Sequence, residues 1–179
     1  MKPRKVDAPR VKPGDVAGFL NILRKSHSLP AEEVERLRES ASGAIRDPRA
    51  VFSSCKESLQ DRGIDEPQSD VYVFVLLDGL ISLRVVAEID WKSLQEDVIW
   101  AIEQISAETK KIALDPIAGR DTASTLSAIG SVIDRRGKRL LQWKTDSDSY
   151  CVMVVKHQFV DEAIRAASRL KIILTPKIR

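Results

Sequence analysis

The chain has 179 residues, of which 43% are hydrophobic, 31% charged and 5% aromatic, and its formal net charge is +3. These proportions are typical of a globular domain and exclude a disordered tail, a collagen-like fibre and a coiled-coil rod. No run of 18 uncharged apolar residues is present, and residues 1–14 lack the apolar segment of a signal peptide. With only two cysteines, the sequence predicts a reduced, cytoplasmic protein without a membrane span.

Charge is distributed unevenly along the chain. Lys and Arg outnumber Asp and Glu by 5 in residues 1–25 and by 6 in residues 111–179, whereas residues 26–110 carry an excess of 8 acidic groups. Either the basic ends pack against the acidic middle of the same or a second copy, or they face an anionic partner such as nucleic acid. Solvated surface charge with some internal complementarity is the more common outcome.

Three parts are predicted along the chain: a basic flexible arm (1–14), a helical subdomain (15–68) and an α/β domain (69–179). Helical spacing predicts three helices in the second part: from near Val16 to residues 26–28, from residues 29–33 to Ile45, and from Asp47 to Gly63. We expect Asp15 to cap the first helix. Cys55 falls on the apolar face of the third and is expected to be a small buried hydrophobe.

The most apolar run, residues 71–86, fits either a strand or a buried helix. We favour a helix over 69–82 followed by a strand over 83–90. The alternative is a hairpin that turns at Asp78-Gly79.

The rest of the α/β domain alternates helices and strands. The predicted elements are a helix capped by Ser93 (93–108), a loop (109–121), a helix (122–135), strands (138–145 and 149–156), a helix (159–170) and a strand (172–174). Residues 150–155 are nearly all apolar, which indicates a central strand buried on both faces.

The expected fold class is α+β. Without one extra helix, the order of elements is that of the four-stranded split βαβ, or ferredoxin-like, sheet. Right-handed crossovers would then place both helices on one face, with the N-terminal helices packed on the other.

Asp90-Trp91-Lys92 ends a predicted strand just before a helix, which is where open α/β sheets place ligands. The aspartate would bind a cation or act as a base, the lysine would bind an anion, and Trp91 would stack. An ordinary strand exit with a surface charge pair is the more frequent explanation.

Other chemical candidates are weaker. Asp146-Ser147-Asp148 has two carboxylates that could hold a divalent cation with Asp115 and Asp121, but its residue types favour a plain turn. Cys151 and His157 lie about 20 Å apart along one strand and cannot form a catalytic pair. We therefore expect no catalytic set, no metal site and no cofactor.

Four cations cluster after the helix that ends near residue 135: Arg135, Arg136, Lys138 and Arg139. They could grip phosphates, and Trp143 on the next strand could stack a base. Cations are also favoured at a helix C-terminus, and the aromatic signature of RNA-binding sheets is absent.

The segment Gly79-Leu-Ile-Ser-Leu-Arg-Val-Val-Ala-Glu-Ile-Asp-Trp91, with Lys92 next, resembles an uncharacterised bacterial domain family. That family also has a Ser/Asp-rich turn followed by Tyr, where Asp148 and Tyr150 stand here. The resemblance covers about residues 70–175 and implies a bacterial cytosolic α/β protein of unassigned activity. It marks Asp90, Trp91, Lys92, Asp148 and Tyr150 as positions that converge on a ligand or partner.

The leading hypothesis is a non-enzymatic interaction or regulatory module that binds a protein partner or a second copy of itself. A nucleic-acid-binding protein using the basic arm and Arg135–Arg139 is the first alternative. A metal-dependent enzyme using Asp90 and Asp148 is the second.

Overall fold

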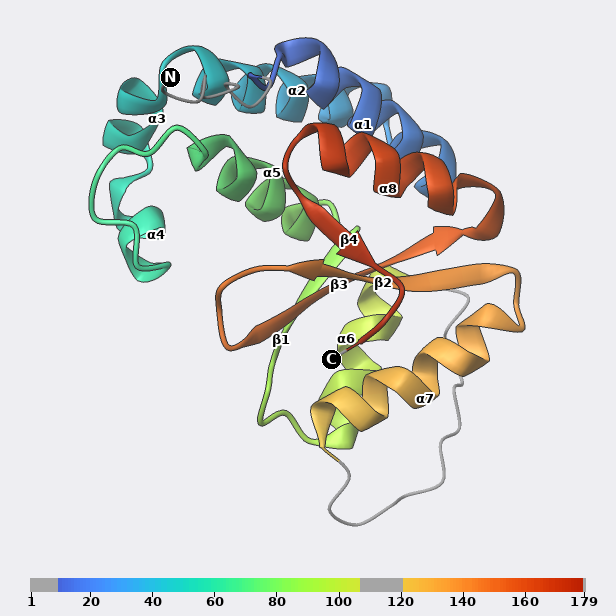
Figure 1. Cartoon of the computed structure of the whole chain (residues 1–179). Coiled ribbons are helices and arrows are strands. Elements are labelled where there is room, and N and C mark those ends of the chain that lie inside the picture. The colour runs from blue at the N-terminus through green and yellow to red at the C-terminus, as the bar shows by residue number, and fades with distance from the viewer. Residues whose placement is uncertain (1–9, 107–120, 179) are drawn as a thin grey trace, which may run out of the picture.

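The structure, a computed structural model, describes residues 10–106 and 121–178, which form a four-stranded sheet with helices on both faces (Figure 1). The helices before the sheet are α1 (Pro13–His27), α2 (Ala31–Arg46), α3 (Pro48–Ser54), α4 (Lys56–Asp61) and α5 (Val71–Ser82). The strands are β1 (Val86–Asp90), β2 (Lys138–Lys144), β3 (Ser149–Lys156) and β4 (Ile173–Thr175). The remaining elements are α6 (Gln95–Ile105), α7 (Thr122–Asp134), the 3-10 turn η2 (His157–Phe159) and α8 (Val160–Arg169). The predicted α+β class is confirmed.

The strand order is β1-β3-β2-β4, and each neighbouring pair is antiparallel. Glu88 lies opposite Cys151, and Trp143 lies opposite Leu174. Residues 151–155 of β3 are all buried, because neighbouring strands flank it and helices cover both of its faces. The prediction of a central strand buried on both faces is confirmed.

This strand order decides which face each crossover helix covers. β1 and β2 are parallel with β3 between them, and β3 and β4 are parallel with β2 between them. The β1–β2 and β3–β4 connections both move two positions along the sheet in the same direction, but β1 and β3, from which they start, run in opposite directions. Right-handed connections therefore place their helices on opposite faces of the sheet. Accordingly α6 and α7 lie on one face and α8 on the other (Figure 1). The prediction that both crossovers share a face is wrong, because β4 pairs with β2 rather than with β1.

Two apolar cores result. The larger lies between the sheet and the layer formed by α1, α2, α5 and α8, and Phe19 meets the edge of the Trp143 ring there, with ring centroids 6.3 Å apart. The smaller lies between the sheet and α6–α7. The prediction that the N-terminal helices cover one face is confirmed, and the C-terminal α8 joins them.

The ambiguous apolar run is a buried helix, as favoured, and the hairpin at Asp78-Gly79 is excluded. Gly79 lies where α5 meets α2, and a Cβ atom there would come within 3.2 Å of Leu37 Cγ. β1 begins three residues later than predicted, because Arg84 adopts a positive φ of 54° at the helix exit.

Three local predictions are wrong. Asp15 is not the N-cap residue: it is the third residue of α1, and its carboxylate accepts from the backbone N–H of the N-cap Lys12 at 2.9 Å, as part of a capping box. Ser93 does not cap α6, which starts after Leu94. The third predicted helix breaks into α3 and α4 at Cys55, whose side chain is exposed.

The predicted arm and loop fall largely in 1–9 and 107–120, outside the described residues. Within the described ranges, no helix is both long and apolar enough to cross a membrane.

Candidate functional site

The end of the sheet where β1 stops and β2 turns into β3 borders a large cavity. Its volume is about 850 Å³, and it lies between α4–α5 on one side and the β2–β3 turn on the other. These elements face each other in Figure 1. The apolar lining comes from Val73, Phe74, Leu77, Trp143 and Ile172. We call this cavity the main cleft.

One arginine organises the wall of the main cleft. Arg62, at the end of α4, donates from Nη1 and Nη2 to the two carboxylate oxygens of Glu88 on β1, at 3.3 and 3.2 Å. Nη2 also donates to Asp78 Oδ1 on α5, at 2.5 Å. Burial opposes the charged guanidinium, but hydrogen bonds and charge from Glu88 and Asp78 prevail and raise the pKa of Arg62. These ion pairs therefore hold α4, α5 and β1 together at one corner of the cleft.

Tyr72 and Lys171 also line the main cleft. The buried Tyr72 hydroxyl donates to the Leu170 carbonyl at 2.8 Å, which ties the start of α5 to the exit of α8. Burial, with the charges of Asp70 and Asp15, raises the pKa of Tyr72 to about 12. The hydroxyl stays protonated at neutral pH and keeps this bond.

A second cavity, of about 310 Å³, lies on the other side of the β2–β3 turn. Three of the positions singled out from the sequence line it: Trp91, Asp148 and Tyr150. Their convergence follows from the register, because Ile89 lies opposite Tyr150 and Asp90 opposite Ser149. The two cavities share part of their lining, and the β2–β3 turn therefore lies between the two cavities. The shared residues are Lys144, Thr145, Ser147 and Ser149.

Asp90 and Lys92 make local contacts at the point where β1 ends. Asp90 Oδ1 accepts from the Lys92 backbone N–H at 2.7 Å, and Lys92 Nζ lies 4.7 Å from the centre of the Trp91 ring. The Thr122 hydroxyl donates to the Trp91 carbonyl at 2.7 Å and so joins α7 to this exit. Trp91 remains 51% exposed.

The candidate carboxylates of the turn are not gathered for a metal. In the described part of the chain, no three His, Cys, Asp or Glu side chains lie close enough to hold an ion. Asp121 caps α7 by accepting from the Ser124 N–H at 2.6 Å. Asp115 lies outside the described residues.

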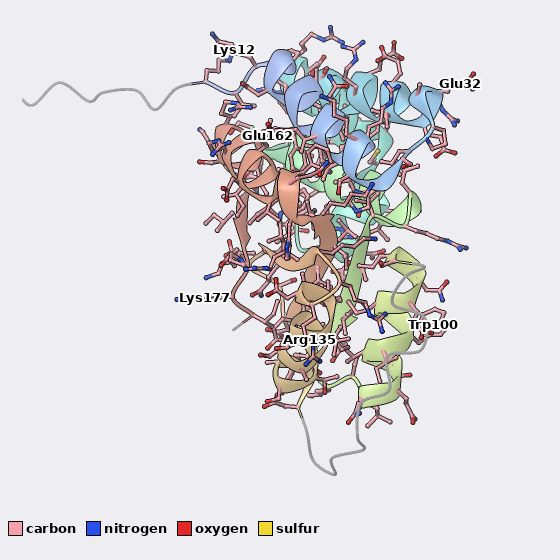
Figure 2. All side chains as sticks on the ribbon, turned by 90° about the vertical axis from the view of Figure 1, so that its right-hand side faces the viewer. Lys12, Glu32, Trp100, Arg135, Glu162 and Lys177 are labelled. Atoms are coloured by element: carbon pink, nitrogen blue, oxygen red, sulfur yellow. The ribbon has the colours of Figure 1, made fainter. Side chains whose placement is uncertain are left out.

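The basic cluster occupies the exit of α7 and the start of β2. Asp134 Oδ1 accepts from Arg139 and from His157 Nε2, at 2.7 and 2.8 Å. These partners, His157 first, lower the pKa of Asp134. Arg135 is exposed at the C-terminal end of α7 (Figure 2). Trp143 is only 1% exposed, so the prediction that it stacks a base is wrong: its side chain points into the larger core.

Cys151 and His27 both lie in surroundings that are removed from solvent to some degree. Cys151 is fully buried, and burial raises the pKa of its thiol to about 12, so it is no nucleophile at neutral pH. His27 is half-buried against β3, and burial lowers its pKa. Among the described side chains, neither cysteine is hydrogen-bonded to a histidine.

Sequence reasoning missed the main cleft because its polar residues are far apart in the chain. Arg62 meets Glu88 across 26 positions, and Tyr72 reaches Leu170 across 98. The one available signal is that Arg62 is the only cation among six carboxylates in residues 57–78. A lone arginine in such a segment indicates an ion pair that holds elements together.

A family model described as a domain of unknown function (DUF6630) matches residues 17–177. The chain therefore belongs to this family, and the predicted membership of an uncharacterised family is confirmed. The match includes the N-terminal helices, which the resemblance noted in the sequence did not cover. No curated protein and no solved structure matches the chain.

Proposed function

We propose that this member of the DUF6630 family is a non-catalytic interaction module of a bacterial cytosolic protein, and that it binds an extended segment of a partner protein beside the β2–β3 turn. The main cleft carries this proposal. It combines an apolar floor with a polar rim, as sites for extended segments do. Both cysteines are free thiols, which supports a reducing compartment.

The geometry of the turn favours a segment over a compact small ligand. The cavities of about 850 and 310 Å³ lie on opposite sides of residues shared by both, so an occupant that crosses the turn contacts the two together. Trp91, exposed beside the smaller cavity, is the residue type that most often supplies binding energy in protein interfaces. Arg62 keeps the cleft wall in place before the partner arrives.

A single filling substitution tests this function. Ser58 is exposed on α4 and lines the main cleft, so Ser58→Trp should obstruct it without entering the core. Ser40→Trp on α2 is the matched control, because Ser40 is also an exposed helical serine and does not line the cleft. The tagged chain is used for pull-down from native lysate at physiological salt, with nuclease in parallel.

A protein that survives nuclease and is lost with Ser58→Trp but retained with Ser40→Trp would support the proposal. Retention with both variants would contradict it. Light scattering of the purified chain shows whether that partner is a second copy. Co-purifying nucleic acid that nuclease removes would favour the basic alternative, for which the exposed Arg135 is the starting residue.

A further inference from the structure

A small basic cavity adjoins the main cleft at the start of α5. It has a volume of about 220 Å³, and three cations from distant segments line it: Arg10, Arg46 and Lys171. Asp70 is the one carboxylate in its lining, and the Ser69 hydroxyl is also there. The charge around the cavity is therefore close to +2.

Among the described residues that line the cavity, the single carboxylate of Asp70 balances only one of the three cations. All three are exposed, and within the described ranges none of them forms a salt bridge. Like charges gathered at one cavity repel each other and weaken the folded state. An anionic ligand would turn this repulsion into attraction.

The fold holds the cations in place through their neighbours. Val11, next to Arg10, is buried in the larger core. Asp47, next to Arg46, caps α3 by accepting from the Ala50 N–H at 3.0 Å. Lys171 adopts a positive φ of 57°, directly after the carbonyl that the Tyr72 hydroxyl binds. Each cation thus extends from a backbone that is already fixed.

We infer that this cavity binds the phosphate group of a small phosphate monoester. Such a group carries about −1.5 to −2 charges at neutral pH, which balances the local excess, whereas one carboxylate would leave half of it. Arginine side chains match phosphate oxygens with paired N–H donors, and Ser69 adds a hydroxyl. Asp70, Tyr72 and Lys171 line both this cavity and the main cleft, so the organic part of the ester extends towards the cleft.

This inference concerns a phosphate-binding cavity that adjoins the main cleft, and it requires no protein partner. Calorimetric titration of the whole chain at constant ionic strength tests it, with inorganic phosphate and phenyl phosphate as probes. We expect saturable binding of both, with phenyl phosphate at least about threefold tighter because its ring reaches beyond the charged cavity. Equal affinities would overturn the assignment to an ester, and the absence of saturable binding would overturn the site.

Matched variants locate the binding. Arg46→Gln should weaken phenyl phosphate at least about fivefold, since it removes one charged hydrogen-bonding partner. Arg49→Gln is the control, because Arg49 is exposed three residues away and does not line the cavity. An equal loss in both variants would mean general attraction to a basic surface and would refute the site. Ser58→Trp should leave inorganic phosphate binding unchanged, which separates this test from that of the main cleft.

Discussion

Arg62 and Glu88 meet through two hydrogen bonds, at 3.3 and 3.2 Å, and they join α4 to β1 beside the main cleft. Both side chains are more than two-thirds buried. Asp78 is the third member of the group. The contribution of such a pair to stability lies between two limits. Surface salt bridges contribute little, whereas disruption of a buried pair leaves an uncompensated charge and costs much more.

We therefore expect Arg62→Met to lower the free energy of unfolding by about 1–2 kcal/mol, because two carboxylates lose their partner. Glu88→Gln should cost less, since Asp78 still binds the guanidinium. Urea denaturation of both single variants and the double variant gives the coupling energy, which should reach at least about 0.5 kcal/mol. Strictly additive effects would show that the pair contributes nothing.

The close contact of α5 with α2 makes a prediction at Gly79. Alanine normally stabilises a helix interior by about 1 kcal/mol relative to glycine. Here the added Cβ would meet the Leu37 side chain, including Cγ at 3.2 Å. Gly79→Ala should therefore destabilise the protein by about 1–3 kcal/mol through overpacking.

A smaller partner should relieve that clash. We expect Gly79→Ala combined with Leu37→Val to lose less stability than the sum of the two single variants in thermal or urea unfolding. Gly43→Ala on α2 is the control, since a Cβ there meets nothing within 4 Å. If Gly43→Ala lost as much stability as Gly79→Ala, the effect would not come from the α2–α5 contact.

The tryptophans should differ sharply in their effect on stability. Trp143 is 1% exposed and packs on Phe19, so Trp143→Ala should cost about 3–5 kcal/mol. Trp100 points out from α6 and is 64% exposed, so Trp100→Ala should change the free energy of unfolding by less than about 0.5 kcal/mol (Figure 2). Chemical denaturation measures both, and comparable costs would contradict the burial of Trp143.

Alkaline pH should weaken the fold through Cys151. Its pKa is raised by burial from about 9 to about 12, so the unfolded thiol ionises first. The stabilisation is complete below about pH 9 and is lost as the pH rises towards 12. Between about pH 8 and pH 10.5, the wild type should lose about 1–2 kcal/mol more than Cys151→Val.

The exposed thiol supplies the control for this pH effect. Cys55→Val should keep the wild-type dependence, because Cys55 is exposed and its replacement leaves the buried Cys151 in place. Parallel urea curves for Cys151→Val and wild type across this range would show that the thiol is not the source. The stability that Tyr72 contributes is also lost as the pH rises above about 10, but this loss is the same in all three proteins.

Local patterns predicted most elements of this fold, and tertiary pairing set the rest. The helix predicted over 69–82 is present as α5, and the unbroken apolarity of residues 150–155 correctly indicates the central strand β3. The sequence could not place β4 beside β2, because a strand of three residues has no pattern that selects one neighbouring strand over another. Cys55 was misassigned since helical spacing continues across a break between α3 and α4 that only packing reveals.

The candidate site was predictable only where neighbouring residues meet. Trp91 and Tyr150 follow from strand ends that adjoin in the register. Arg62, Tyr72 and Lys171 come together through contacts between distant segments, for which composition and spacing give no signal. Gly79 illustrates the same limit: the turn-like Asp-Gly pair is present, but the glycine serves a helix contact.

The layer made of α1, α2, α5 and α8 takes its members from both ends of the chain. The Lys156 N–H donates to Ser26 Oγ at 3.1 Å across 130 positions, and α8 packs on α1. During synthesis, α1 through α5 leave the ribosome long before α8 can cover them. Their apolar surface stays open for several seconds at ordinary elongation rates of about 5–20 residues per second. Fragments that stop before α8 should therefore expose this apolar surface and aggregate.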